Sequence, residues 1–245
     1  LPASYSQLIK PLLLPSVWEY RGNVPGITRL IIAILKHDPQ STFAADQLSL
    51  SALLGVFQKL ISSKANDLYG FELLETILLY IPLNLLQPFL NQIAILLLTR
   101  LQSSRTDKFV KKFFILLFSL SCVPVNAELN SRTNGHINGE FVVNFVDAAQ
   151  PGVFGKIFTS FILPTSSSYA NLQDKKILIV GLLKLLEAPQ FKSTYTQQFP
   201  LGLAKLIENV SFLGGIQKST NVAASGLGAA VSVEVRELDL ESSTF

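Results

Sequence analysis

The chain of 245 residues contains no Met, one Cys and two His, and only 15% of its residues are charged. With Cys122 alone, the sequence excludes an internal disulfide framework, so we expect a cytosolic or nuclear protein. His37 and His136 lie far apart with no Cys beside either, which excludes the standard zinc spacings. We therefore expect neither a metal nor a cofactor. Because the chain starts without Met, we expect a piece of a longer protein.

The few charges are nearly balanced: 20 Lys and Arg face 17 Asp and Glu, for a formal net charge of +3. A hydrophobic share of 49% excludes a disordered chain, and the length allows one or two domains. The modest charge favours neither nucleic acid nor a membrane surface as partner. The longest uncharged run, residues 76–99, is broken by Pro82 and Pro88, so we expect no membrane insertion. A membrane-associated helical protein remains an alternative.

Apolar residues recur with helical spacing along most of the chain. Between residues 50 and 61 they fall at i, i+3, i+4, i+7, i+10 and i+11, which is one face of a 3.6-residue period. Helix-start signals stand at the breaks. Thr106 precedes Asp107, and Pro25 follows Asn23 within a first turn.

The predicted helices form pairs, and the second helices of successive pairs start about 40 residues apart, which is the period of HEAT or armadillo arrays. Neither helix of a pair can bury its apolar face alone, so the pairs must stack. We predict an all-α fold, a HEAT-repeat α-solenoid of antiparallel helix pairs stacked in a superhelix. A closed helix bundle is the alternative. The predicted pairs are 45–63 with 66–81, 84–102 with 106–122, 139–150 with 152–163, and 174–187 with 198–213.

The array is predicted to cover residues 1–213, with about four pairs preceded by an incomplete one. Residues 124–138 form a polar insertion that we expect to be a surface loop. Residues 214–245 are rich in small residues, and we expect a loose or extended tail. Within this tail Val231, Val233 and Val235 alternate like a strand, but in isolation.

Motifs for catalysis are missing. The segment 152–156 has two residues between its glycines where a phosphate-binding loop needs four, and Ile157 follows its Lys. Cys122 ends an apolar helix and is interpreted as a core residue rather than a nucleophile. We therefore expect a protein that is not an enzyme and that acts through its surface.

The densest group of cations surrounds the start of the helix predicted at 106–122. Lys108, Lys111 and Lys112 share one stripe at i, i+3 and i+4, in the first turns, where the helix dipole disfavours cations. A solvated face is one interpretation, and a surface for an acidic partner is the other. The candidates for partner binding in this group are Arg100, Arg105, Lys108, Lys111 and Lys112.

Two further segments add candidates. Arg21 lies close to Trp18, the only Trp, which we interpret as a packing anchor between repeats. Lys59, Lys64 and Asn66 lie near the turn within one predicted pair, and such turns often form the binding surface of a solenoid.

Three blocks carry a family resemblance: LPSVWEYRGNVP at residues 14–25, LLGVFQKLISSKAND at 53–67 and RLQSSRT at 100–106. They resemble the importin-α export receptors, the exportin-2 family of importin-β-like proteins, over residues 10–190. The resemblance implies the C-terminal region of a long superhelix, with no assigned contact residues.

The resemblance also implies a role. A receptor of this kind binds importin-α together with Ran-GTP, shuttles between nucleus and cytoplasm, and returns importin-α to the cytoplasm. Nucleoporins are candidate further partners. From the modest net charge we expect no nucleic acid as a partner. The alternative function is a HEAT-repeat interaction scaffold without a Ran-linked cycle.

Overall fold

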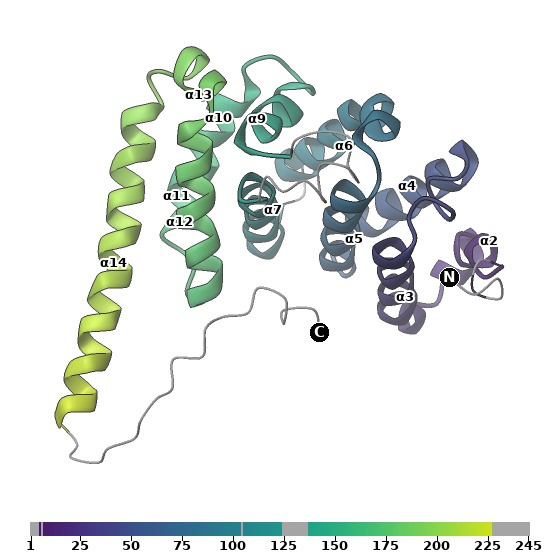
Figure 1. The fold of residues 1–245 in the computed structure, drawn as a ribbon, viewed down its shortest axis with the longest axis horizontal. Helices are drawn as coiled ribbons and strands as arrows, with labels where there is room; N and C mark the ends of the chain where they lie inside the picture. The colour runs from purple at the N-terminus through teal and green to yellow at the C-terminus, as the bar shows by residue number, and fades with distance from the viewer. Residues whose placement is uncertain (1–4, 6, 104, 124–136, 227–245) are drawn as a thin grey trace. The chain divides into compact units, whose positions relative to one another are not determined.

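The computed structural model describes residues 5, 7–103, 105–123 and 137–226, and for 215–226 only the backbone. Within these ranges every regular element is helical (Figure 1). The chain divides into two units, Leu1–Asn209 and Val210–Phe245. The elements are α2 (Ile9–Leu12), η1 (Pro15–Trp18), η2 (Arg21–Asn23), α3 (Val24–His37), α4 (Gln47–Ser62), α5 (Asp67–Tyr80), α6 (Leu83–Ser103), α7 (Asp107–Ser121), α9 (Gly139–Asp147), α10 (Val153–Ile157), η3 (Phe158–Ile162), α11 (Leu163–Ser166), α12 (Leu172–Glu187), α13 (Pro189–Thr194) and α14 (Phe199–Gly226).

Short polar side chains start several of these helices. The hydroxyl of Thr106 accepts a hydrogen bond from the backbone N–H of Phe109 at 3.2 Å, as its position before Asp107 predicts. Pro25 lies in the first turn of α3, also as predicted, but the side chain of Asn23 makes no capping bond. Helix starts were therefore readable from the sequence, although not every cap forms.

Within the unit Leu1–Asn209 the helices pack as pairs and the pairs pack on one another. The pairs α4–α5, α6–α7 and α9–α10 are those predicted. In one row α3 packs on α5, α5 on α7, and α7 on α12. Helices α3, α5 and α7 are second helices, whereas α12, which was predicted as the first helix of the last pair, lies in the same row. The first helices form another row, in which α4 packs on α6 and α6 on α9. We call these the inner and outer helices. Two stacked rows are the arrangement of an α-solenoid, not of a closed bundle.

The helices α12 and α14 make up the last predicted pair and touch where α14 carries Gly202. A Cβ at this position would lie 2.8 Å from Cδ2 of Leu186 and 2.9 Å from Cζ of Phe158. Glycine therefore lets the first turns of α14 approach α12 and η3 more closely than any other residue would.

The prediction and the structure differ at three places. The helix predicted at 152–163 is continuous through Ser166 but contains the π-helical turn η3, because Pro164 cannot donate the regular backbone bond. The short helix α13 was not predicted. Helix α14 continues to Gly226, past the predicted boundary at 213, since Gly214 and Gly215 each cost a helix only about 1 kcal/mol.

Some predictions concern residues outside the described ranges. They are the surface loop over residues 124–136, the strand-like alternation from Val231 to Val235, and the remaining tail at 227–245. The last two residues of the polar insertion are described. Ile137 is 4% exposed, and Asn138 caps α9 by accepting from the N–H of Phe141. These two residues therefore belong to the packed array.

Trp18 anchors the first repeat. It is 4% exposed, and its indole Nε1 donates to the backbone carbonyl of Leu12 at 2.8 Å. The predicted packing role is confirmed.

Among the described helices, none has both the length and the apolarity needed to cross a membrane.

Cys122 at the end of α7 is half-buried, and its Sγ lies 3.9 Å from the carbonyl oxygen of Ile177. Burial raises the pKa of its thiol to about 11. At pH 8 we expect the folded protein to react with an aromatic disulfide reagent about a hundredfold more slowly than a free thiol, because the thiolate is the nucleophile. The chain unfolded in denaturant is the control. Equal rates in both states would contradict the assigned burial.

Candidate partner-binding edge

The turns that precede the inner helices lie along one edge of the unit Leu1–Asn209. The Nζ of Lys59 donates to the carbonyl of Pro15 at 3.3 Å, which joins the end of α4 to η1. The Nε of Arg100 donates to the carbonyl of Ile61 at 3.2 Å, which joins the end of α6 to the end of α4. We call residues 15–23, 59–66, 102–103 and 105–108 the turn edge.

Most of the candidates named from the sequence meet on this edge. They come from three segments separated by about 40 residues each, and the helix pairing brings them together. All of their charged side chains are exposed, and Asn66 is half-buried at the start of α5, where its side chain makes no capping bond. The members are Arg21, Lys59, Lys64, Asn66, Arg105 and Lys108.

Among the described residues these cations have no carboxylate at ion-pair distance, although the charge of Lys108 acts on the carboxyl of Asp67 to lower its pKa. Lys59 bonds a backbone carbonyl, and the guanidinium of Arg105 lies 5.2 Å from the ring centroid of Phe161. In the described part of the chain none of the five cations forms an ion pair. The only exposed acids of the turn edge are Glu19 and Asp107. The edge therefore carries a net positive charge.

The prediction that Arg100 contacts a partner is wrong, because the structure places this side chain inside the array. It is 6% exposed, its Nη2 lies 3.7 Å from Oδ2 of Asp67, and its guanidinium lies 5.1 Å from the ring centroid of Phe109. With its bond to Ile61, this one side chain connects α6 to α4, α5 and α7. Burial raises the pKa of the Asp67 carboxyl, and the charges of Lys108 and Arg100 oppose this. Arg100 holds the repeats together and is not an exposed contact residue.

The three lysines of the predicted stripe do not share one exposed surface. Lys111 is half-buried; its Nζ donates to the carbonyl of Ser168 at 3.0 Å, and its own carbonyl accepts from the hydroxyl of Tyr169 at 2.9 Å. Lys112 is exposed, and its charge attracts the carboxylate of Glu75 on α5. Burial raises the pKa of Glu75, and the charge of Lys112 opposes this rise. Only Lys108 belongs to the turn edge. A charge-reversal test of partner binding therefore belongs on Lys108 and Lys64.

Tyr20 was missed by the sequence analysis. It lies between η1 and η2, beside Arg21, and is 72% exposed. Trp18 in the same segment was interpreted as a packing anchor, and its burial agrees with that interpretation. The signal that could have found Tyr20 is an aromatic residue flanked by Glu19 and Arg21 in a turn, since exposed aromatic residues are enriched in interfaces.

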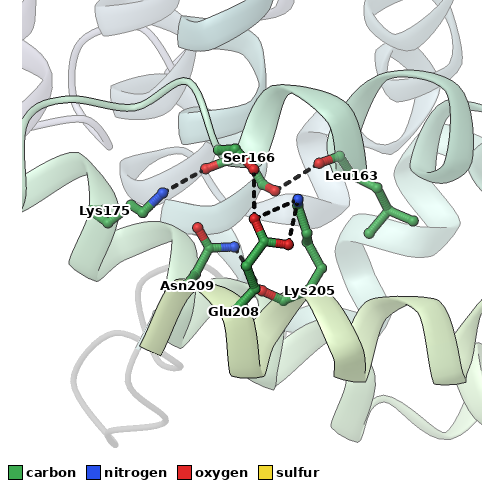
Figure 2. Close-up of polar contacts among 7 residues, drawn as sticks. Leu163, Ser166, Lys175, Lys205, Glu208 and Asn209 are labelled. Carbon is green, nitrogen blue, oxygen red and sulfur yellow. Dashed lines mark hydrogen bonds and ion pairs between the residues drawn. The ribbon is translucent and has the colours of Figure 1, made fainter. Parts of the chain in front are cut away.

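A second polar cluster joins α11, α12 and the start of α14 (Figure 2). Lys175 is 4% exposed and donates to the carbonyl of Ser166 at 2.9 Å, and burial lowers its pKa. The hydroxyl of Ser167 and the Nζ of Lys205 both donate to Glu208, which lowers the pKa of this carboxyl. These bonds remain within the unit, so the cluster fastens α14 rather than offering a site.

No group of three His, Cys, Asp or Glu side chains that could hold a metal ion occurs among the described residues. The stacked helix pairs define an α-solenoid with a positively charged edge. The family model described as "CAS/CSE protein, C-terminus" matches residues 1–220, and the chain belongs to this family.

Curated relatives agree with this assignment. The chain is 38% identical over 212 residues to the "Importin alpha re-exporter" of Saccharomyces cerevisiae. This match covers 86% of this chain and 20% of that protein. It is 40% identical to the "Importin-alpha re-exporter" of Schizosaccharomyces pombe, covering 76% and 18%, and 37% identical to "Exportin-2" of Homo sapiens, covering 84% and 20%. The chain thus spans about a fifth of the length of these relatives. They are named as exporters, not as enzymes.

A solved structure supports the fold. The chain matches "The exportin Cse1 in its cargo-free, cytoplasmic state" with a TM-score of 0.74 and 38% identity, over 86% of this chain and 21% of that one. The predicted all-α HEAT-repeat α-solenoid is confirmed, as is the predicted family.

Proposed function

We propose that this chain is a segment of a nuclear export receptor that binds importin-α together with Ran-GTP and returns importin-α to the cytoplasm. The observation that carries the proposal is the family match over residues 1–220, supported by relatives named importin-α re-exporters in two yeasts. The proposal includes shuttling between nucleus and cytoplasm. Contact with nucleoporins stays a prediction.

Within such a receptor, the segment supplies a folded array of repeats with a positive edge. The cations of the turn edge are spread over three successive turns, so a partner would contact several repeats at once. We assign Arg21, Lys59, Lys64, Asn66, Arg105 and Lys108 to partner contact. Arg100 and Lys111 are left out because their partners lie within the array, and Lys112 is left out because it lies outside the turn edge.

The test is calorimetric titration of the full chain with importin-α, with and without Ran loaded with a non-hydrolysable GTP analogue. We expect binding that loaded Ran tightens by about fivefold or more, the size of a typical coupling between two ligands. Ran loaded with GDP is the matched control. Binding that is the same in both cases would favour the alternative scaffold without a Ran-linked cycle. No binding at all would contradict the assignment of a partner-binding surface to this segment.

A further inference from the structure

The turn edge gathers exposed cations near the starts of the inner helices. Arg21, Lys64 and Arg105 lie two or three residues before α3, α5 and α7, and Lys108 lies in the first turn of α7. Lys59 lies in the last turn of α4, where the helix dipole favours a cation, whereas the dipole of α7 disfavours Lys108. Helix stability therefore does not account for Lys108.

At the other ends of the helices, charge follows the dipoles. Asp46 caps α4 by accepting from the N–H of Ser49, and Glu140 lies in the first turn of α9. Lys36 lies in the last turn of α3. These acids at N-termini and this cation at a C-terminus stabilise their helices. Asp107 and Lys59 at the turn edge follow the dipoles too, so the unusual feature of this edge is its net positive charge.

The spacing of the cations fits a protein segment. Packed helices lie about 8–10 Å apart, so cations on successive turns are separated by about that distance. Two turns of an α-helix advance by about 11 Å, which places acidic side chains at matching intervals. The exposed ring of Tyr20 stands at one end of this row and supplies an aromatic contact of the kind that anchors interfaces.

We propose that the turn edge binds an acidic segment of a partner protein, with Tyr20 as the apolar anchor and Lys64, Arg105 and Lys108 as the charged contacts. The proposal rests on the proposed function in taking the chain as part of a receptor for proteins. Nucleic acid is the less favoured occupant. Binding of single strands relies on several stacking aromatic side chains, and the described turn edge exposes only Tyr20.

The test measures fluorescence anisotropy with the full chain and three labelled probes. Two are peptides of about 16 residues, roughly 24 Å long as a helix: polyglutamate, and the same peptide ending in two leucines. The third is an oligouridylate of similar length. None contains importin-α or Ran, so failure here and failure of the proposed function are distinguishable.

We expect K64E/K108E to weaken both peptides about tenfold, equivalent to about 1.4 kcal/mol, and to reduce the dependence of binding on salt. The matched control K156E/K192E changes the net charge equally at exposed lysines of α10 and α13, and should leave affinity within about twofold. Y20A should remove the advantage of the leucine-ended probe, through faster dissociation, without changing the salt dependence.

Three results would overturn the proposal: no peptide binding at low salt, equal loss in both double variants, or tighter binding of the oligouridylate than of either peptide. Circular dichroism checks that each variant is folded. K64E/K108E places negative charge in the first turn of α7, which suits the helix dipole, but it also reverses a cation whose charge acts on the buried carboxyl of Asp67, so we expect it to fold with reduced stability. The neutral pair K64Q/K108Q keeps the test available if the reversed pair unfolds, with a smaller loss of affinity expected.

Discussion

Replacing Arg100 with Ala is expected to lower the free energy of unfolding by about 3–5 kcal/mol, because it leaves the carboxylate of Asp67 buried without its ion-pair partner. Asp67 is 0% exposed, and Arg100 is its ion-pair partner at 3.7 Å. The substitution also removes the donor to the carbonyl of Ile61 and the cation above the ring of Phe109. Chemical denaturation monitored by circular dichroism measures the loss.

Two variants control this experiment. Arg105→Ala removes an exposed arginine a few residues away and should have a much smaller effect. The double variant R100M/D67L replaces both charges with apolar side chains and should recover much of the lost stability. If R100A were no less stable than R105A, Arg100 would not connect the repeats as described.

The stability that R100A loses relative to the wild type should also depend on pH. Burial already raises the pKa of Asp67 above its ordinary value of 3.8, and removal of Arg100 raises it further. An acid with a raised pKa in the folded state favours folding when protonated, and this contribution is lost as pH rises through the folded pKa. The difference between wild type and R100A should therefore be largest at neutral pH and should narrow as pH falls toward 3.8. A constant difference would contradict the assignment to Asp67.

Gly181→Ala is expected to destabilise the protein by about 2–3 kcal/mol through overpacking between α7 and α12. A Cβ on Gly181 would lie 2.5 Å from the Cβ of Phe118 and 2.7 Å from its Cα, so backbone would have to move. The inner helices can approach this closely only because Gly181 has no side chain. Thermal and chemical denaturation measure the change.

Gly55→Ala is the matched control for this substitution. Gly55 also lies inside a helix, α4, but a Cβ there would meet nothing within 4 Å. The better helix propensity of Ala should stabilise this variant by about 0.5–1 kcal/mol. Opposite signs for the two variants are expected. A stabilised G181A would mean that α7 and α12 are not in close contact.

The predicted helices show how far periodicity alone reaches. The helices found at 47–62, 67–80 and 107–121 lie within those predicted at 45–63, 66–81 and 106–122. A packed pair must bury one apolar stripe on each helix, and that requirement is written directly in the spacing of Leu, Ile and Phe. Short elements such as α13 have too few residues to show a period, and this is why it was missed.

Candidate contact residues were harder to judge. A cation at a helix end can lie on the surface or reach into the array, and the local sequence is similar in both cases. Arg100 and Arg105 are five positions apart; the first lies among four helices and the second is exposed. Which one is buried depends on where the neighbouring repeat places Asp67 and Ile61.

The sequence by itself determined the longer helices, the pairing of those between residues 45 and 122 at a period of about 40 residues, and the family, because each is encoded in local spacing or in contiguous blocks. Only the tertiary structure decided that Arg100 is buried, that the lysines at 108, 111 and 112 face different neighbours, and that Tyr20 is exposed while Trp18 is not. The physical reason is that exposure depends on the neighbouring repeats, whose residues lie far away in the chain, as Asp67 and Ile61 do from Arg100.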